Sequence, residues 1–536
     1  MQSCKSLSQR LQQKRQIPWV HGEYGTCLPS KETADILIDK YLRTFETVQR
    51  ILHVPTFRRE YRMFWENQSQ APFDFLIKMQ LCFSLGACLY DDIFSLRPQA
   101  LQWIREASAW TESFDSPNLS ISGVQIMCLL SLAQNVVQEL IGDRTWIRSG
   151  ALIRLAMAIG LHRDPTKLPS MPAAQGEMRR RLWTTVLELA LSSCLDAGGT
   201  LLISLRDFDC MLPMNLDDTQ LDFDDNGDLL ASDSATYTDT TLQIALAQTF
   251  PARLAIAEYA NGFNSEQSYD KTLRLAADLK SATTRFGESI KVHHAKITDF
   301  QRRYYEMVMD RYMFMLHIPY ATVALKDSAF LLSRDTCVDA ALRLSYAALD
   351  SRLMPDAFLD SARAAMVVTA PCQDYVRLVL CGAGLFRATQ TQALMIIAAE
   401  LHARLVNWSE GACLDTTGPL GTLRGQELLS FLRVGVEWTK CRILAGQDNI
   451  KDYVFQAAIL AGITAMIEGG SVKEATDNEG KEACIKAKAL LVNLVGDDEP
   501  SNTGQAGVAE DSWNFHANDF WTADWADCTG SFVIPQ

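Results

Sequence analysis

The sequence predicts an all-α fold, with one large multi-helix body and disordered termini. Apolar residues recur three and four positions apart along most of the chain, which is the spacing of a helix face, and the alternation of a strand is hard to find. The composition, with 48% hydrophobic and 21% charged residues, is typical of a globular protein. The 536 residues suffice for two or three cores or for one large helical domain.

The first segment, 1–30, is predicted to be basic and flexible. Its first 16 residues carry Lys5, Arg10, Lys14 and Arg15 and no acid, and no apolar stretch follows that would make a signal peptide. An alternative interpretation of SLSQRLQQKRQ, residues 6–16, is the remnant of a linker or a coiled coil.

Residues 31–212 are predicted to be the first helical half. By their helical periodicity we expect helices at 31–50, 74–92, 97–111, 121–141, 145–161 and 175–196. In the helix at 145–161, two adjoining apolar stripes indicate burial. Gly160 suits the left-handed position after a helix, and Pro165 cannot continue one. The triplet His162-Arg163-Asp164 therefore falls in the exit turn.

The helix at 175–196 has Glu177 and Arg181 one turn apart, and Gly198 and Gly199 end it. Residues 213–239 are acidic and turn-rich, and we expect an exposed linker loop there. The second helical half, 240–496, is expected to contain helices at 240–262, 268–286, 298–325, 335–350, 373–407, 424–445, 451–468 and 479–495.

The last segment, 497–536, is predicted to be a disordered acidic-aromatic tail. From Asp497 onward it has eight acids, no Lys or Arg, and several Trp and Phe residues. Acids keep exposed aromatic side chains soluble and available to grooves on partner proteins.

The enzyme motifs in this sequence are all incomplete, and we assign no catalytic and no cofactor-binding residue. His162-Arg163-Asp164 is the triplet of a kinase catalytic loop, but the fourth residue after Asp164 is Leu168 where a kinase has a metal-binding Asn, and no Gly-rich loop precedes it. GAGLF at 382–386 lacks the third glycine of a dinucleotide loop, and EGK at 479–481 lacks the spacing of a phosphate loop.

No metal-binding residue is assigned either. The closest candidate is DFDDNGDLLASD, 222–233, a partial calcium loop that ends in Asp233 where a bidentate Glu is usual. A solvated linker explains this composition as well. Zinc modules need close thiolate pairs, and the nearest cysteines, Cys82 and Cys88, lie in an apolar helical run. His293, His294 and His317 have no ligand spacing.

The charge of the chain does not favour nucleic acid. The net charge is -14 and the pI is near 5.1, so the surface as a whole repels phosphate. The arginine clusters at 179–181 and 302–303 lie in periodic helices, where we expect ion pairs and capped carbonyls. The 14 cysteines show no disulfide rhythm and are interpreted as reduced intracellular thiols. No uncharged run is long and apolar enough to predict a membrane span.

Four stretches together are similar to a known family. They are LIDKYLRTFETVQRILHVPTFRREYRMFW (37–65), GALIRLAMAIGLHRDPT (150–166), EMRRRLWTTVLELALSSCLDAGGTLLISLRDFDCMLPMNLDD (177–218) and RYMFMLHIPYA (311–321). Their order and spacing resemble the middle homology region, the fungal-specific transcription factor domain, of zinc binuclear cluster transcription factors. The resemblance implies a large all-α regulatory domain, a nuclear location and a role in transcription regulation. It also implies that His162, Arg163 and Asp164 are architecture, with Arg163 or Asp164 tied to Arg179 or Arg180.

The sequence departs from that family in two places. The six-cysteine zinc cluster is missing, so zinc and DNA binding are expected only if such a cluster lies upstream of Met1, in a chain of which this is a fragment. A member that has lost its zinc cluster is the other interpretation. GGTLL at 198–202 replaces the usual Gly-x-Pro turn.

Three functions remain open at this point. The first is a transcription regulator with a helical regulatory domain, which could sense a small molecule, and an acidic-aromatic tail that recruits transcription machinery. The second is a co-regulator or dominant-negative partner of related factors, in a homo- or heterodimer and without DNA contact of its own. The third, a helical enzyme, is the remote one. The effector, the target genes and the direction of regulation do not follow from the sequence.

Overall fold

The computed structural model describes residues 2–15, 25, 27–112, 119–138, 142–221, 223, 229–233, 236–262, 268–292, 296–325, 327–349, 372–409, 420 and 423–495. Within these residues the secondary structure is helical and contains no strand, as predicted. The tail 497–536, the pair His293-His294 and residues 222 and 224–228 of the 222–233 loop lie outside them.

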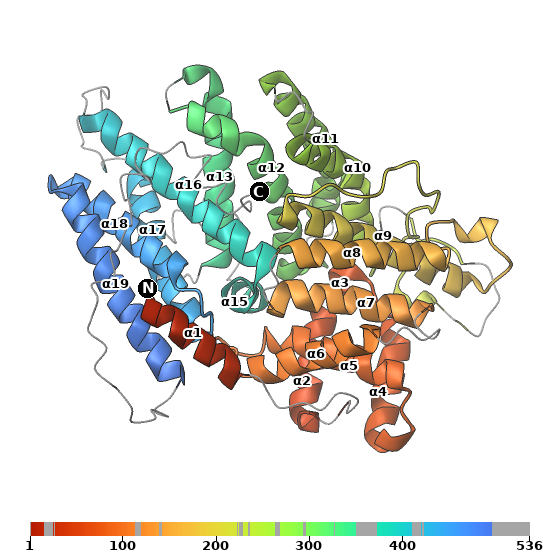
Figure 1. Ribbon diagram of the computed structural model, residues 1–536. Coiled ribbons are helices and arrows are strands. Elements are labelled where there is room, and N and C mark those ends of the chain that lie inside the picture. The colour runs from red at the N-terminus through yellow and green to blue at the C-terminus, as the bar shows by residue number, and fades with distance from the viewer. Residues whose placement is uncertain are drawn as a thin grey trace, which may run out of the picture.

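The first half of the chain forms a stack of helices. Their bounds are α2 Lys31–Arg43, α3 Glu46–Gln49, α4 Val54–Glu66, α5 Phe73–Ala87, α6 Arg97–Glu112, α7 Ile121–Ala133, the π-helical turn η3 Gln134–Gln138, α8 Gly142–Ala158 and α9 Ala173–Ala197. Helix α5 packs between α2, α6 and α7, and α8 lies along α9 (Figure 1).

The second half continues the stack on the other side of α9. Its helices are α10 Thr241–Asn261, α11 Tyr269–Val292, α12 Asp299–Val323, α13 Leu331–Ala348, α15 Gln373–Cys381, α16 Gly384–Ser409, α17 Leu423–Leu444, α18 Lys451–Glu468 and α19 Val472–Val495. Helix α10 packs on α9 and α12, and α13 packs between α12 and α16.

One hydrophobic core joins the two halves. The main cluster of buried apolar side chains runs from Ala34 in α2 to Ile463 in α18 without a division near residue 213. The two helical halves that the sequence predicts therefore pack as one body, because the apolar faces of α9 and α12 are buried in the same core.

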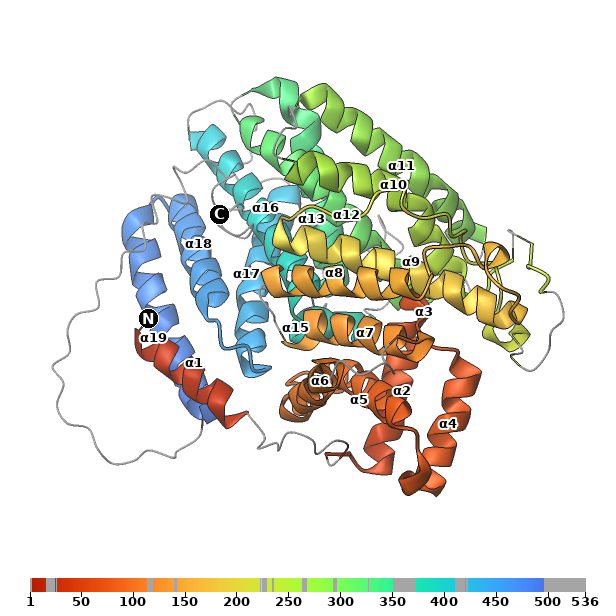
Figure 2. The ribbon, with the colours of Figure 1, turned by 45° about the vertical axis from the view of Figure 1, so that its right-hand side comes forward.

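The N-terminal segment contains a helix that the sequence analysis did not predict. Helix α1, Gln2–Lys14, packs along α19 at the far edge of the molecule, as both views show (Figures 1 and 2). Cys4 and Leu11 are buried there with Leu491 and Val495 in a second, smaller core. The prediction of flexibility for 1–30 is thus wrong for residues 2–14.

Three other helix boundaries differ from the prediction. Helix α4 was missed, although Phe57, Tyr61 and Phe64 form its buried face. The expected helix at 31–50 breaks after Arg43, and the one at 373–407 breaks after Cys381. The second break has a visible cause, because Gly384 has φ +53 and a Cβ there would lie 2.7 Å from the backbone oxygen of Asn135.

One stretch is apolar and long enough to cross a membrane by composition alone. It is Ile121–Gln138, which comprises α7 and η3, and 72% of it is buried inside the protein. It packs against α5, α8 and α9, as a core helix does.

Candidate functional site

The exit of α8 has the geometry that the sequence predicted. Gly160 has φ +78, its backbone N–H donates to the Met157 carbonyl at 2.9 Å, and Leu161 N–H donates to the Ala156 carbonyl at 2.9 Å. These two bonds close a Schellman motif and satisfy carbonyls at the helix end. The triplet 162–164 follows in the turn.

Asp164 is the centre of this turn. Its carboxylate accepts hydrogen bonds from Arg180 Nε and Nη2, both at 3.0 Å, from the Thr166 hydroxyl at 2.7 Å and from Met211 N–H at 3.1 Å. Burial alone would raise the pKa of Asp164, but the bonds from Arg180 and Thr166 outweigh it and hold that pKa well below its usual range. The predicted tie between the turn and the arginine helix is therefore confirmed for Asp164 and Arg180.

The neighbouring residues of the motif are structural too. Arg179 donates to the Ile159 carbonyl at 2.6 Å and so caps the end of α8. Arg163 is half exposed and pairs with Asp209 at 3.1 Å. His162 packs against Trp183, with ring centroids 6.2 Å apart, and its backbone carbonyl accepts the N–H groups of Asp209 and Cys210.

Within the described part of the acidic segment 213–239, which we expected to be an exposed linker loop, several residues are exposed but Asp218 is buried. Asp218 is 3% exposed and lies between two buried arginines: Arg181 Nη1 is 2.6 Å from its carboxylate, and Arg50 contacts the same oxygen. Val54 N–H donates to the second oxygen at 2.9 Å. The prediction failed because the charge that compensates Asp218 comes partly from Arg50, 168 residues away. We call Arg50, Arg181 and Asp218 the strap anchor, because they hold the segment 213–239 against Arg50, which follows α3, and Arg181 of α9.

Burial and charge act in opposite directions around the strap anchor. Burial would raise the pKa of Asp218, but Arg50 and Arg181 lower it. Glu177 is also buried, and there burial prevails over Arg181 and raises the pKa to about 7. Arg50 itself has φ 51, a left-handed conformation that is uncommon for a residue with a side chain, and its ion pair compensates for that strain.

The other candidate residues do not come together as a site. Cys82 and Cys88 are fully buried, and burial raises the pKa of both thiols, so they are inert. Arg302 pairs with Asp299 and Glu306, and Arg303 donates to the Ala347 carbonyl.

Three further motifs are built into helices. His317 is buried, bonds Ser333 at 2.9 Å, and burial lowers its pKa to about 4, which keeps it neutral. GAGLF at 382–386 comprises the two residues between α15 and α16 and the first three residues of α16, and EGK at 479–481 lies inside α19. Among the described residues no three His, Cys, Asp or Glu side chains gather as a metal site. Residues 222 and 224–228 of the candidate calcium loop lie outside the described residues.

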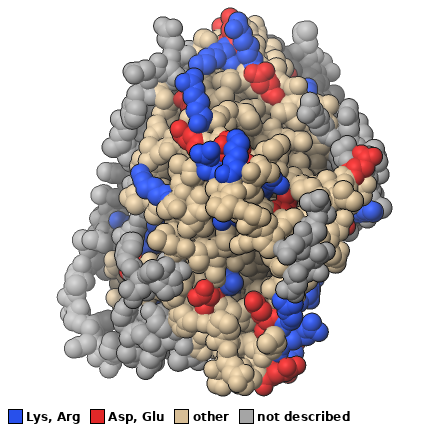
Figure 3. All heavy atoms as spheres, turned by 90° about the vertical axis from the view of Figure 1, so that its right-hand side faces the viewer, with Lys and Arg blue, Asp and Glu red and all other residues tan. Residues whose placement is uncertain are grey.

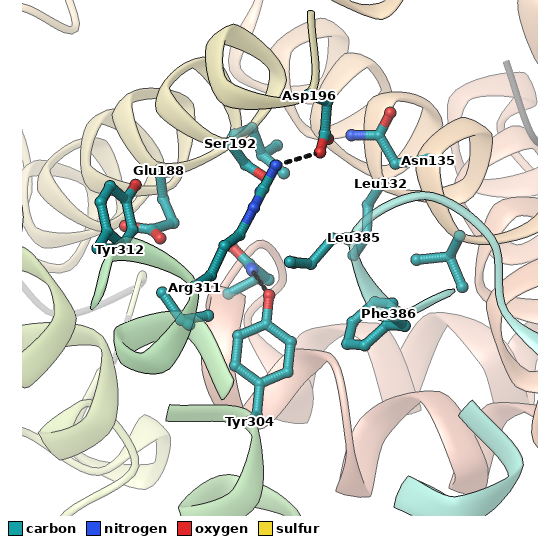
Figure 4. A pocket seen from close by; sticks show the side chains of 14 residues that line it. Leu132, Asn135, Glu188, Ser192, Asp196, Tyr304, Arg311, Tyr312, Leu385 and Phe386 are labelled. Atoms are coloured by element: carbon teal, nitrogen blue, oxygen red, sulfur yellow. Dashed lines mark hydrogen bonds and ion pairs between the residues drawn. The ribbon is translucent and has the colours of Figure 1, made fainter. Parts of the chain in front are cut away.

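A pocket that the sequence analysis did not find lies in the middle of the body. It is lined by residues of α3, α7, η3, α9, α12 and α16 (Figure 4). Its cavity volume is about 30 Å³. Its walls come from both halves of the chain, which is why no local pattern indicates it.

The polar part of the pocket is an ion pair between helices. Arg311 of α12 reaches across to Asp196 at the end of α9, with 2.5 Å between Nη2 and Oδ1, and Asn135 and Ser192 lie beside this pair (Figure 4). A second carboxylate on the wall, Glu188, is held by two bonds of 2.6 Å from Arg253.

The opposite part of the pocket is mostly apolar. Leu132, Leu385 and Phe386 face the cavity, and the Tyr304 hydroxyl points into it (Figure 4). Tyr304 accepts a hydrogen bond from Gln49 Nε2 at 3.1 Å. The tight approach of Gly384 to η3, together with a 2.7 Å bond from Ala383 N–H to the Val136 carbonyl, fixes the start of α16 at this wall.

The face shown in Figure 3 carries both Lys and Arg and Asp and Glu side chains on a largely uncharged surface. Near the α8 exit, Arg163 and Lys167 are both exposed and both pair with Asp209. These two cations are therefore partly compensated by a carboxylate.

Comparison with known proteins identifies the architecture. Residues 38–291 match the model of the fungal specific transcription factor domain, which covers the motif turn, the strap anchor and α9. The chain carries a fungal-specific transcription factor domain. The resemblance seen in the sequence is thereby confirmed.

Curated relatives agree over most of the chain. The chain is 32% identical over 508 residues to "Transcription factor opdR" of Penicillium oxalicum, which covers 92% of this chain and 63% of that protein. It is 31% identical over 513 residues to "Transcription factor lepE" of Aspergillus flavus, covering 91% and 59%. It is 27% identical over 447 residues to "Aspyridones cluster regulator apdR" of Emericella nidulans, covering 80% and 56%.

The chain matches only part of the length of each relative. The chain spans about three fifths of the length of the relatives it matches. The family and these relatives are transcription factors and not enzymes, as predicted. No solved structure matches this chain.

Proposed function

We propose that this chain is a nuclear transcription regulator whose helical body is the regulatory domain. The observation that supports this most strongly is the 32% identity to a transcription factor along 92% of the chain. The name of the Emericella nidulans relative favours control of a gene cluster as the task of this chain as well.

In this proposal the tail activates transcription by binding partner proteins. Residues 497–536 combine acids with Trp and Phe, the composition of segments that bind apolar grooves on partner proteins. DNA contact would come from a zinc cluster outside residues 1–536 or from a partner, since these residues contain no six-cysteine cluster and carry a net charge of -14.

A reporter assay tests the output. The full chain is fused to a heterologous DNA-binding domain and expressed beside a reporter gene. We expect activation by the full chain and loss of most of it when the chain ends at residue 496. A control variant, in which the acids of the tail are kept and Trp513, Trp521 and Trp525 become Ser, separates the aromatic contribution from the charge. Equal activation with and without the tail would contradict its role.

The second candidate is a co-regulator without DNA contact of its own. The net charge of -14 favours this alternative. Mobility-shift titration of the purified chain against promoter duplexes at physiological salt separates the two. Specific binding without a partner would exclude the co-regulator.

A further inference from the structure

Helices α1 and α19 each place a cysteine in the small core that joins them. Cys4 of α1 is buried, and Cys484 of α19 is half-buried and packs against the same cluster of apolar side chains, which includes Leu11 and Leu491. The two cysteines belong to opposite ends of the sequence, so only the packing of α1 on α19 brings them into one cluster.

The register of the two helices sets the cysteines at the same height. Lys14, the last residue of α1, donates a hydrogen bond to the carbonyl of Val495, the last residue of α19. Both views show the two helices running in the same direction toward this end (Figures 1 and 2). Cys4 precedes Lys14 by ten residues and Cys484 precedes Val495 by eleven. Since each helical residue advances about 1.5 Å, the two cysteines lie level along the interface.

The cysteines also lie on the faces that meet. Cys4 is two turns from the buried Leu11, and Cys484 is two turns from the buried Leu491. Burial raises the pKa of Cys484, and the charge of the nearby Cys4 thiolate raises it further. The axes of packed helices lie about 8–10 Å apart, and facing Cα atoms then reach the spacing of about 4.4–6.8 Å that a disulfide spans.

The two thiols differ in their access to solvent. Cys484 is half-buried, so a small oxidant can reach it, whereas Cys4 is 4% exposed and lies behind it in the cluster. An accessible thiol with a second thiol beside it is the arrangement of a cysteine that is oxidised first and a cysteine that resolves it. Buried pairs such as Cys82 and Cys88 lack the accessible member.

We propose that Cys4 and Cys484 form a reversible disulfide when the protein meets a hydroperoxide, and that this bond locks α1 onto α19. In the reduced protein α1 is held by its apolar stripe and by hydrogen bonds such as those from Ser8 to the Asp448 carbonyl at 2.7 Å and from Arg15 to the Gly446 carbonyl at 2.6 Å. These contacts can open together, and the disulfide removes the detached state of α1.

The oxidation balances with one peroxide for each disulfide. The Cys484 thiolate attacks hydrogen peroxide, the O–O bond breaks, and the sulfur becomes a sulfenic acid while the leaving hydroxide takes up a proton and forms water. The Cys4 sulfur then attacks the sulfenic sulfur, the S–S bond forms, its proton joins the leaving hydroxyl, and a second water is released. Two thiols are oxidised by two electrons, and the peroxide is reduced to two waters. A dithiol reverses the reaction by exchange.

Peptide mapping of the chain 1–536 tests the pairing. The protein is treated with hydrogen peroxide, alkylated and digested with trypsin without reductant. Cys4 lies in the peptide MQSCK and Cys484 in EACIK, so mass spectrometry detects the disulfide as this linked pair. We expect the pair in protein that runs as a monomer on a non-reducing gel, and its loss after dithiothreitol. It should form at least about 10-fold faster in the folded chain than in urea, where a very long loop must close.

Two variants and a second measurement locate the effect. Cys484→Ser abolishes the linked pair, whereas the matched control Cys441→Ser, at a half-buried cysteine of α17, leaves its formation unchanged. Hydrogen exchange of the α1 amides should become at least about 10-fold slower on oxidation, because opening of α1 is prevented. The exchange of α1 in Cys484→Ser should not respond to peroxide.

Several results would overturn the proposal. They are the absence of the MQSCK–EACIK pair from oxidised folded protein, its presence only in dimers, an equal rate of formation in urea, its loss in Cys441→Ser, or an unchanged exchange of α1 on oxidation. The peptide map of the unmodified chain decides the pairing even if a variant fails to fold. None of these measurements involves DNA or a reporter gene, so their failure leaves the proposed function standing.

Discussion

Two regions of this molecule place arginines against carboxylates in its interior, and they differ in how deeply the carboxylate is buried. In the strap anchor, the Asp218 side chain is 4% exposed; one of its oxygens accepts bonds from Arg50 and Arg181, and the other accepts a bond from Val54 N–H. In the pocket, Arg311 and Asp196 are 12% and 16% exposed and lie beside the half-buried Asn135 and Ser192. The Asp218 carboxylate is fully paired away from solvent, although the buried Arg50 Nε has no partner among the described residues, whereas the Arg311–Asp196 pair keeps contact with solvent.

This difference in burial determines how much a mutation lowers the free energy of unfolding. A buried charge that loses its partner remains in a medium of low polarity, which is strongly destabilising. A charge near a solvent-connected cavity regains water, and its ion pair contributes little net stability. The predictions below use this contrast.

The largest effect is expected in the strap anchor. Arg181→Met leaves Glu177 without its nearest cation and removes one of the two arginines from Asp218. We expect a loss of about 3–5 kcal/mol in the free energy of unfolding, measured by urea titration. Lys167→Met, which breaks an exposed pair with Asp209, is the control and should cost less than about 1 kcal/mol. Similar losses in the two variants would contradict an anchor that is buried away from solvent.

The exit turn of α8 is expected to respond less. Gly160→Ala adds a side chain at φ +78, next to Arg179, and should cost about 1–2 kcal/mol in urea unfolding. Gly287→Ala is the matched control, because nothing lies within 4 Å of a Cβ at that helical glycine. It should stabilise the protein by about 0.5–1 kcal/mol. A harmless Gly160→Ala would mean that the turn is not fixed by its backbone.

The pH dependence tests the electrostatics of the strap region. The folded pKa of Glu177 is raised from 4.5 to about 7 by burial, so its protonated form is favoured in the folded state. Its contribution is present below pH 4.5 and is lost as the pH rises through about 7. Between pH 4.5 and about 7, the unfolding free energy of the Glu177→Gln variant should decrease less than that of the unmodified protein. We expect the difference to be on the order of 1 kcal/mol. An unchanged slope would show that Arg181 keeps Glu177 ionised.

The smallest stability effect is expected in the pocket. Tyr304→Phe removes a hydroxyl whose one bond in the described protein comes from Gln49. We expect a loss below about 1 kcal/mol in thermal unfolding, within the usual range for one neutral hydrogen bond. A loss as large as that of Arg181→Met would show that the pocket is structural as well.

The sequence predicted the local features of this contrast. The α8 exit at Gly160, the tie from Asp164 to Arg180 and the burial of Cys82 and Cys88 all followed from spacing, residue type and the family resemblance. These features depend on interactions that lie close together in the chain or on helical periodicity, both of which are visible in one sequence.

The predictions that were wrong concern features that depend on partners far away in the sequence. Asp218 belongs to an acidic stretch that looks exposed, and its burial becomes visible only when Arg50 and α9 are placed beside it. Helix α1 was interpreted as flexible because its charge dominates its short apolar stripe, and its stability comes from packing on α19. The pocket needs α3, α9, α12 and α16 together, and no segment alone contains its signal.

The most direct test of the account compares one substitution at two carboxylates. Asp218→Asn leaves Arg50 and Arg181 uncompensated in the core, and Asp196→Asn leaves Arg311 beside the pocket, where it can reach water. Unfolding free energies in the same urea titration should differ by at least about 2 kcal/mol, with Asp218→Asn the less stable variant. Equal losses, or a greater loss in Asp196→Asn, would contradict the distinction between an anchor buried away from solvent and an ion pair that keeps contact with solvent.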